Sequence, residues 1–578
     1  MEGDKEATSR RILRRKQANY VQRDVDGVVG RVSLMKINRS IRYLAFVFVL
    51  LFLVLSADLV YWQAIMASTI VANLHNGRRC LSQNAPQRGR IFDRNGVLLA
   101  QSLPDKSAIC GFVRHYSEPS LAGLLGYYVP GYGMLDGVEK QYSAILDGAE
   151  SQTELETIEN QLLHRSMVGN DIYLTIDIRI QRVVSRYFTH YHPQSDPLYK
   201  QPFFRQQAFA SSRGAVVVSD PHTGEILAMV SLPGYDPNRM AQTLAHGDMT
   251  YFNRVNTNKD QPLLMRPLKA LYVPGSIFKT LTLMAALDTG TTTLEHPWFQ
   301  REAMGPLIYG GRQIIGDNLA YGEYTFHFPI TTAYAYANSD NIVFAQLGVN
   351  TGRDLWLDYA HRLTIDRPST FDLPVAMSSV QNSDNQPLST LQLASGAFGQ
   401  GVDNVTPFEM SLMDNAVANN GILMRPRLLL KIVDAQHQLV LASSPQQLNV
   451  VTSKETAYQM RWAMNGVTTC GSAWRVNAAF GPPVSIIGKT GTAEVGAGWN
   501  AHSWMITQAP FWLDDPDQMP AVTIVAMREN AGEGAYAVGP AIWQMYRDIF
   551  HKGYIKTRIP VANNPNLFCP AQNLWQRR

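Results

Sequence analysis

The sequence has little charge, few cysteines and one long apolar run. Asp, Glu, Lys and Arg make up 17% of the 578 residues, the net charge is +4, and 46% of the residues are hydrophobic. A disordered chain, which needs low hydrophobicity and high net charge, is therefore excluded. The excess of positive charge is confined to residues 1–42, which hold 11 Lys and Arg against 5 Asp and Glu. Because the rest of the chain is slightly acidic, this distribution argues against a nucleic-acid-binding protein.

The four cysteines lack the spacing that is typical of zinc sites. They are Cys80, Cys110, Cys470 and Cys569, and no two of them form a Cys-x-x-Cys pair. We therefore expect no metal and no other cofactor. Disulfides that join Cys80 to Cys110 and Cys470 to Cys569 would keep each bridge within one region of the chain, and free buried thiols are an equal alternative.

The one long apolar run, Tyr43–Trp62, has the length of a helix that crosses a bilayer. Asp58 is its one charged residue, and it lies close enough to the end to reach the lipid headgroups. A cleaved signal peptide is the alternative, but some forty residues precede the run and no typical cleavage site follows it. Because basic flanks stay in the cytoplasm, we predict a single-pass anchor in the cell membrane, with the N-terminus cytoplasmic and all that follows the anchor extracytoplasmic.

Five strand-like segments predict a sheet in the region from about residue 206 onwards, with strands from both ends of that region. They are Gly214–Asp220, Glu225–Ser231, Ser485–Glu494, Ser503–Trp512 and Ala521–Arg528. The residues between the two groups, 265–470, are mainly helical in pattern. A mostly antiparallel sheet with a helical insertion predicts an α+β fold.

The sharpest local feature is Pro274–Gly290, in which Ser276 precedes Lys279 by three residues at the start of an apolar helix. At this spacing two side chains share one face of a helix, so the amine lies beside the hydroxyl. Burial lowers the pKa of a lysine, and a neutral amine is a competent base for a serine nucleophile. The spacing alone is weak evidence, because Ser33 and Lys36 in the basic tail share it. A capping serine with a surface lysine is the alternative.

A second feature, Lys489-Thr490-Gly491-Thr492, lies on one of the predicted strands. Gly488 and Gly491 interrupt the strand pattern, as glycines do where a ligand must approach the backbone closely. A lysine with two hydroxyls predicts a carboxylate-binding site, and a free strand edge can pair with an extended peptide. A glycine bulge beside a solvated lysine is the alternative.

The order Ser-x-x-Lys, Ser-x-Asn and Lys-Thr-Gly resembles that of the penicillin-recognising serine acyltransferases. Ser-Asp-Asn occurs twice, at residues 339–341 and at residues 383–385. We favour the first triplet, because it follows Ser276 by 63 residues, close to the spacing of that family, and is flanked by apolar helical sequence. The second triplet lies in a polar stretch that is typical of a loop.

Further segments are similar to the class B penicillin-binding proteins along most of residues 85–550. They are RGRIFDRNGVLLA, DGVEKQYSAILDG, LTIDIRIQ, DPHTGEILAMVSLPGYDPN, FGQGVDNVTPFEM and IGKTGTAE. The resemblance implies a membrane-anchored peptidoglycan D,D-transpeptidase with the transpeptidase fold on a β-rich pedestal. The expected domains are a basic tail (1–42), the anchor (43–63), the pedestal or dimerisation-type domain (64–205), the transpeptidase domain (206–552) and a C-terminal tail (553–578).

The resemblance also implies a role for each motif residue. Ser276 attacks the D-Ala-D-Ala end of a stem peptide, and Lys279 accepts its proton. Ser339 relays a proton to the leaving nitrogen, while Asn341 hydrogen-bonds Lys279 and the substrate. The backbone N–H groups of Ser276 and Thr492 form the oxyanion hole.

For the second motif, the resemblance implies that Lys489, Thr490 and Thr492 hold the terminal carboxylate, with Gly491 in the same substrate-binding strand. A positive charge on Lys489 is expected to help keep Lys279 neutral. β-Lactams are the implied covalent inhibitors, and the implied partner is a SEDS-family glycosyltransferase in the membrane. The implied role is cell wall synthesis, either in division or in elongation. A D,D-carboxypeptidase, a β-lactamase and a β-lactam-binding sensor or scaffold are the alternatives.

Overall fold

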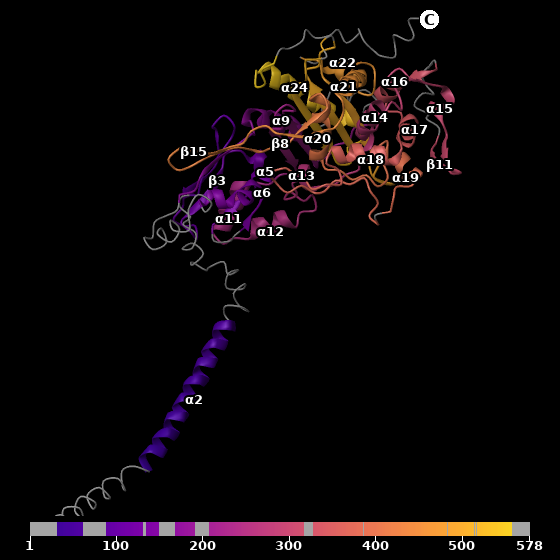
Figure 1. The fold of residues 1–578 in the computed structure, drawn as a ribbon. Helices are drawn as coiled ribbons and strands as arrows, with labels where there is room; N and C mark the ends of the chain where they lie inside the picture. The colour runs from indigo at the N-terminus through magenta and orange to yellow at the C-terminus, as the bar shows by residue number, and fades with distance from the viewer. Residues whose placement is uncertain are drawn as a thin grey trace, which may run out of the picture. The chain divides into compact units, whose positions relative to one another are not determined.

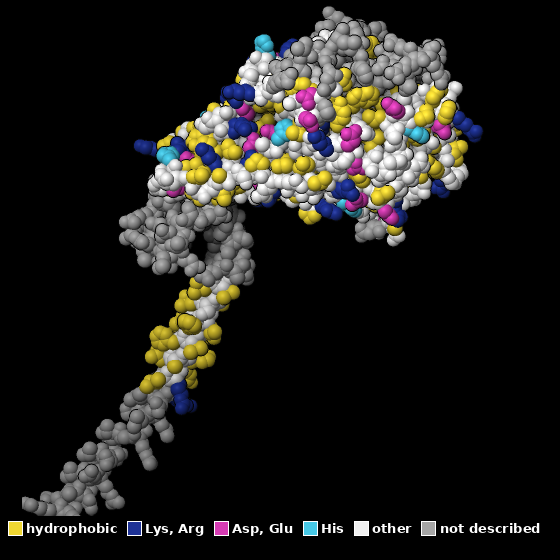
Figure 2. Space-filling model, turned by 45° about the horizontal axis from the view of Figure 1, so that its top comes forward, with side chains coloured by type: hydrophobic (Ala, Val, Ile, Leu, Met, Phe, Trp, Pro, Cys, Tyr) yellow, Lys and Arg dark blue, Asp and Glu magenta, His cyan; other side chains and the backbone are white. Residues whose placement is uncertain are grey.

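The structure is a computed structural model that describes residues 32–61, 88–130, 134–148, 168–190, 207–316, 328–384, 386–481, 484–513, 515 and 517–557. It divides into two units, residues 1–79 and residues 80–578. The described part of the first unit is helix α2, Val32–Val60. Its segment Ile41–Val60 is long and apolar enough to cross a membrane, as a single-pass anchor requires. Figure 2 shows hydrophobic side chains along this helix.

A five-stranded antiparallel sheet forms the centre of the second unit (Figure 1). Its strands are β7 (Gly214–Ser219), β8 (Ile226–Leu232), β17 (Ile487–Ala493), β18 (His502–Ala509) and β19 (Val522–Arg528). Their order is β17-β18-β19-β7-β8, so the two ends of this region meet where β19 pairs with β7. The predicted sheet, built from both ends of the region, is confirmed.

Helices cover both faces of this sheet. Gln508 of β18 donates to the Asp414 side chain on α20 (Pro407–Ala418), whereas its neighbour Thr507 hydrogen-bonds Tyr546 on α24 (Gly539–His551). Because successive side chains of a strand point to opposite faces, α20 and α24 lie on opposite sides. All residues of β19 are buried, as a doubly covered strand requires.

The region between the strand groups is rich in helices, as predicted. Its helices are α11 (Pro237–Ala245), α12 (Thr250–Asn256), α13 (Arg266–Lys269), α14 (Lys279–Asp288), α15 (Gln300–Met304), α16 (Thr332–Ala337), α17 (Asn341–Thr351), α18 (Arg353–Arg362), α19 (Thr390–Gly396), α20, α21 (Lys454–Thr469) and α22 (Trp474–Phe480), whereas the short helix α23 (Gly534–Ala537) follows β19. Short strands lie among them: β9 (Pro297–Trp298), β10 (Leu307–Tyr309), β11 (Arg312–Ile315), β12 (Ile330–Thr331), β13 (Ile422–Met424) and β16 (Gln447–Val450).

A second sheet of six strands has the order β15-β14-β6-β1-β2-β3. Four strands come from the predicted pedestal: β1 (Ile91–Phe92), β2 (Leu98–Pro104), β3 (Phe112–Tyr116) and β6 (Asp171–Leu174). The remaining described elements of that region are β4 (Tyr128–Val129), β5 (Met134–Leu135), α5 (Ala122–Leu125), α6 (Gly137–Gln141), α7 (Ser143–Leu146) and α9 (Ile178–His190). The Asn95-Gly96 turn joins β1 to β2 as a hairpin, with Gly96 at φ +83°. Beside the sheet, the fully buried Glu139 accepts hydrogen bonds from Arg88 and Arg114.

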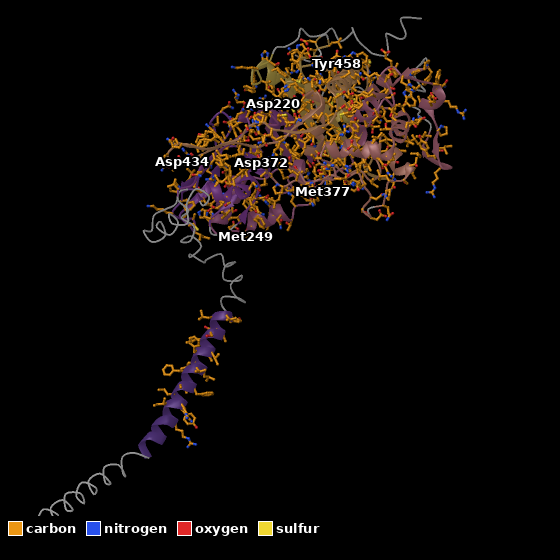
Figure 3. All side chains as sticks on the ribbon, viewed as in Figure 1. Asp220, Met249, Asp372, Met377, Asp434 and Tyr458 are labelled. Carbon is orange, nitrogen blue, oxygen red and sulfur yellow. The ribbon has the colours of Figure 1, made fainter. Side chains whose placement is uncertain are left out.

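The other two strands correct the prediction that residues 265–470 are mainly helical. β14 (Leu429–Val433) and β15 (Leu439–Ala442) form a hairpin, and β14 pairs with β6 in the six-stranded sheet. Two aspartates, Asp372 and Asp434, which are labelled in Figure 3, form hydrogen bonds to the backbone of this hairpin and of the residue before it. Asp372 accepts hydrogen bonds from the N–H groups of Leu428 and Leu429, and Asp434 accepts two in the turn. The apolar residues of β14 form a strand and not the predicted helix, because pairing with the distant strand β6 decides their conformation.

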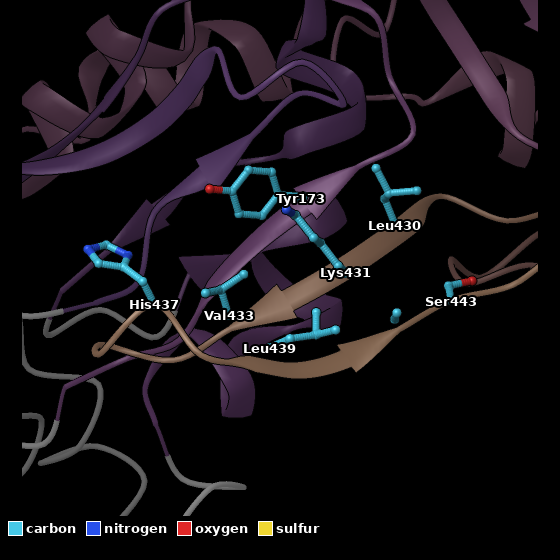
Figure 4. A pocket seen from close by; sticks show the side chains of 8 residues that line it. Tyr173, Leu430, Lys431, Val433, His437, Leu439 and Ser443 are labelled. Carbon is cyan, nitrogen blue, oxygen red and sulfur yellow. The ribbon is translucent and has the colours of Figure 1, made fainter.

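A pocket of about 450 Å³ lies against this hairpin (Figure 4). Tyr173 of β6, Lys431 and Val433 of β14 and Leu439 of β15 line it, and Lys431 Nζ lies 4.3 Å from the centre of the Tyr173 ring. None of the motif residues from the sequence lies in its wall. This pocket is therefore separate from the candidate site.

Cys110 and Cys470 are the described cysteines, and each of them takes part in a disulfide bond, which excludes a free thiol at either position. Cys80 and Cys569 lie outside the described residues. The pairing of the four cysteines stays a prediction.

Candidate active site

Ser276 lies in a single 3₁₀ turn, Gly275–Phe278, that leads into α14. Gly275 has φ +59°, and its N–H donates to the Gly399 carbonyl at 2.9 Å. A Cβ at this position would lie 2.8 Å from the Thr492 carbonyl oxygen. Gly275 is therefore needed both for its conformation and for the close approach of the turn to β17.

Lys279 is completely buried at the start of α14, and four acceptor atoms surround its amine. Its Nζ lies 3.0 Å from Ser276 Oγ, 2.6 Å from Asn341 Oδ1, and 3.1 and 2.5 Å from Oγ and the carbonyl oxygen of Ser339. Burial lowers its pKa to about 7, although the negative charge of Asp340 raises it. Near neutral pH a substantial fraction of this amine is therefore uncharged and able to take the proton of the Ser276 hydroxyl.

Ser339 is held in the left-handed backbone region, at φ +64°. Its N–H donates to the Tyr336 carbonyl, and its hydroxyl lies 2.9 Å from Lys489 Nζ as well as 3.1 Å from Lys279 Nζ. The hydroxyl therefore lies between two lysines, a position from which it can pass a proton. A left-handed serine costs free energy, and such strain often occurs at functional sites.

Asp340 caps helix α17, which is a contact that the sequence analysis missed. Its side chain accepts hydrogen bonds from the N–H groups of Ile342 and Val343, at 2.8 and 3.0 Å. The signal was present, because an aspartate directly before an apolar helical run is typical of an N-cap. Through this cap, Asp340 places the adjacent Asn341 in the first turn of α17, where its side chain meets Lys279.

Lys489 lies on the edge strand β17 and is completely buried. Its Nζ contacts Ser339 Oγ and the Thr490 carbonyl, each at 2.9 Å. Burial lowers its pKa well below the usual value, and the charge on Lys279 lowers it further. Burial is the main cause of the low pKa of Lys279. Repulsion between two amines is mutual, so the expected contribution of a charge on Lys489 to keeping Lys279 neutral stays a prediction.

Gly491 brings β17 against the serine turn. A Cβ on Gly491 would lie 2.9 Å from Ile277 Cγ2 and 3.2 Å from the Ile277 nitrogen. Thr492 follows with an exposed side chain, beside the turn that carries Ser276. The oxyanion hole expected from the N–H groups of Ser276 and Thr492 stays a prediction, and this packing puts the two residues in neighbouring backbone segments.

The two Ser-Asp-Asn triplets have different surroundings. Ser339 and Asn341 contact Lys279, as described above, whereas Ser383 and Asp384 are exposed in a loop, and Asn385 lies outside the described residues. The structure thus brings together Ser276, Lys279, the first triplet and Lys489. Within the described ranges, no group of three or more His, Cys, Asp or Glu side chains is arranged to hold a metal ion.

The family described as the penicillin binding protein transpeptidase domain matches residues 214–543, and that described as the penicillin binding protein A dimerisation domain matches residues 88–172. The peptidoglycan D,D-transpeptidase PbpA of Mycolicibacterium smegmatis is 28% identical over 516 residues, which cover 87% of this chain and 96% of the relative. The peptidoglycan D,D-transpeptidase MrdA of Acinetobacter baumannii is 26% identical over 458 residues, which cover 74% and 62%.

Solved structures give the same result. The imipenem acyl-enzyme complex of penicillin-binding protein A from Mycobacterium tuberculosis is similar with a TM-score of 0.68 and 27% identity, over 81% of this chain and 100% of that one. The ceftriaxone complex of the same protein has a TM-score of 0.65 and 26% identity, over 80% and 98%.

Proposed function

The chain belongs to the family of penicillin-binding proteins with a transpeptidase domain, and we propose that it is a peptidoglycan D,D-transpeptidase whose nucleophile is Ser276. The observation that carries the assignment of the nucleophile is the buried Lys279 amine, 3.0 Å from the Ser276 hydroxyl, with a pKa lowered to about 7. An amine in this state accepts a proton from a serine that attacks a carbonyl.

In the first half-reaction, Ser276 Oγ bonds to the carbonyl carbon between the two D-alanines of a stem peptide. Its proton passes to Lys279 Nζ, and from there through the Ser339 hydroxyl to the leaving nitrogen. Contacts of Ser339 Oγ with both lysines support this path. The C–N bond breaks, D-alanine leaves, and an ester joins the donor peptide to Ser276.

In the second half-reaction, the amine of a neighbouring stem peptide attacks the ester. A new C–N bond forms, the C–O bond to Ser276 breaks, and the proton that the amine loses returns to Ser276 Oγ through Lys279. The ester retains the free energy of the original peptide bond, so the cross-link forms without ATP. β-Lactams acylate the same serine and block this step.

The donor carboxylate binds to Lys489, Thr490 and Thr492 in this proposal. A bound carboxylate favours the charged form of Lys489 and so raises its pKa, which burial holds low in the empty site. The backbone N–H groups of Ser276 and Thr492 stabilise the oxyanion, and one such donor contributes on the order of 3–4 kcal/mol.

We further propose the orientation and the partner of the chain. The surplus of basic residues before the apolar helix favours a cytoplasmic N-terminus and an extracytoplasmic catalytic domain. Residues 64–205, with β14 and β15, hold the transpeptidase domain of residues 206–552 as a pedestal. Residues 88–172, between the anchor and the transpeptidase domain, match a dimerisation domain. We therefore propose that glycan polymerisation belongs to another protein, a SEDS-family glycosyltransferase in the membrane.

Labelling of the detergent-solubilised full chain with a fluorescent penicillin tests the nucleophile. Ser276→Ala should abolish the label, whereas the matched control Ser383→Ala, in the exposed second triplet, should label like wild type. Persistent labelling of Ser276→Ala would place the nucleophile elsewhere, and a lost label in Ser383→Ala would reverse the choice of triplet.

Product analysis separates the proposal from its alternatives. With stem peptides and an acceptor amine, a transpeptidase forms cross-linked dimers, whereas a carboxypeptidase releases D-alanine without them. Rapid turnover of nitrocefin would indicate a β-lactamase. If Ser276→Ala restores growth as well as wild type does in a depleted strain, the protein acts as a sensor or a scaffold.

A further inference from the structure

Ser472 lies next to the Lys-Thr-Gly strand, although it belongs to none of the three motifs. It follows helix α21 in the turn Cys470–Ser472, and its hydroxyl lies 2.5 Å from the Thr490 hydroxyl. Among the described residues, no other side chain is hydrogen-bonded to the Thr490 hydroxyl. Thr490 is 6% exposed and Ser472 is half-buried, so the pair lies at the edge of the site.

The backbone around Ser472 is fixed on both sides. Its N–H donates to the Ala337 carbonyl at 3.0 Å, at the end of the helix that precedes Ser339. A Cβ on Gly471 would lie 2.2 Å from the Ala337 carbonyl oxygen, and the Gly471 N–H donates to the Gly466 carbonyl. The backbone of Ser472 is therefore held between α16, which precedes Ser339, and β17, which carries Lys489, so it cannot move away from Thr490 without breaking these contacts.

Two hydroxyls at this distance share one hydrogen, so one donates and the other accepts. In the empty site either direction is possible. When a carboxylate binds at Thr490, the Thr490 hydrogen goes to the carboxylate, because a hydrogen bond to an ionised acceptor is about twice as strong as a neutral one. The Ser472 hydrogen then points to Thr490 Oγ1, which leaves the Thr490 hydrogen free for the ligand.

We propose that Ser472 is a positioning residue for the substrate carboxylate, and that it acts by donating to Thr490 Oγ1 and so directing the Thr490 hydroxyl hydrogen towards the donor's terminal carboxylate. This inference rests on the proposed function, because it assumes that the strand of Thr490 binds that group. It extends the carboxylate site by a hydroxyl from a different part of the chain.

The test compares acylation of the full-length protein by benzylpenicillin, which has a free carboxylate, with acylation by benzylpenicillin methyl ester, which does not. Ser472→Ala should lower the second-order rate constant for the acid about tenfold, the effect of one modest hydrogen bond. The rate constant for the ester should change less than about twofold, because the ester offers no ionised acceptor. Ser472→Thr, which keeps the hydroxyl, should restore the rate for the acid.

Two further variants show how Ser472 acts. In Thr490→Val, the additional Ser472→Ala change should have no further effect, because both act through one hydroxyl. Ser453→Ala removes a hydroxyl from the other end of α21, where it caps the helix. This control should lower stability without changing the ratio of the acid and ester rates.

Equal loss of both rates in Ser472→Ala would overturn the inference, since it would show that the Ser472 hydroxyl supports β17 without acting on the carboxylate. Additive effects of Ser472→Ala and Thr490→Val would overturn it as well. Failure of the proposed function has a different signature: the wild-type protein would then not be acylated by benzylpenicillin at Ser276. An acylated wild type with an unchanged acid-to-ester ratio in Ser472→Ala refutes the role of Ser472 alone.

Discussion

Replacing Gly491 by alanine tests whether catalysis depends on the contact between β17 and the serine turn. The added methyl group would lie 2.9 Å from Ile277 Cγ2, 3.0 Å from Trp504 Cβ and 3.2 Å from the Ile277 nitrogen. Ile277 and Trp504 are fully buried, and the third contact is backbone. The strand and the turn must therefore separate, because no flexible chain end is available to move.

The size of the effect follows from these distances. Ordinary contacts of a Cβ are 3.4–4 Å, so relief of the closest contact requires a separation of about 0.5 Å or more. This separation moves Ser276 away from Thr492. The backbone N–H groups of these two residues are the expected oxyanion donors. Loss of one such donor lowers the rate about 10²–10³-fold, so we expect Gly491→Ala to lower the acylation rate constant by about 10²-fold.

The assay is the second-order rate constant for labelling of the full-length protein by a fluorescent penicillin, together with a thermal melt that shows that the variant is folded. Gly234→Ala is the matched control, because Gly234 is exposed and a Cβ there would meet its nearest atom at 3.9 Å. A folded Gly491→Ala protein that reacts within about threefold of wild type would refute the argument, since it would show that the contact does not align the oxyanion donors.

Three other predictions follow from the titrating and buried groups. Because Lys279 must be neutral to act as a base and its pKa is about 7, the acylation rate should fall as the pH drops through 7 and level off above it; a rate that is flat between pH 5 and pH 8, measured with a fluorescent penicillin, would contradict this role. Asp340→Asn should shift that fall to lower pH, because the charge that raises the pKa of Lys279 is removed, while the melting temperature changes little, because asparagine is an equally good N-cap; an unshifted profile would argue against the electrostatic effect. Glu139→Gln should destabilise the second unit by about 3–5 kcal/mol in a denaturant titration, because it leaves Arg88 and Arg114 buried without their shared carboxylate; a loss below about 1 kcal/mol would mean that another group compensates for the two charges.

Several features could be predicted from the sequence because they depend on neighbouring residues. The Asn95-Gly96 hairpin, the strands β7, β8, β17, β18 and β19 and the helix that begins near Ser276 all follow from local periodicity and turn residues. Within the candidate site, the three-residue spacing of Ser276 and Lys279 already placed the amine beside the hydroxyl.

Other features depend on contacts between residues that are far apart in the sequence. The β14–β15 hairpin belongs to the six-stranded sheet because β14 pairs with the edge of β6. The sequence of residues 429–442 does not indicate which strand they pair with. The preference for the first Ser-Asp-Asn triplet rested on spacing and flanking sequence, whereas the contacts of Ser339 with both lysines exist only in the folded chain.

The sequence by itself determined the strands of the central sheet, the apolar N-terminal helix and the identity of the reactive groups, since periodicity, turn chemistry and residue type are local properties. The tertiary structure alone decided which of those groups are buried and which of them meet. Burial sets the pKa of Lys279, and the placement of Ser472 against Thr490 joins two segments that are 18 residues apart. Both effects come from packing between distant segments, which local patterns do not encode.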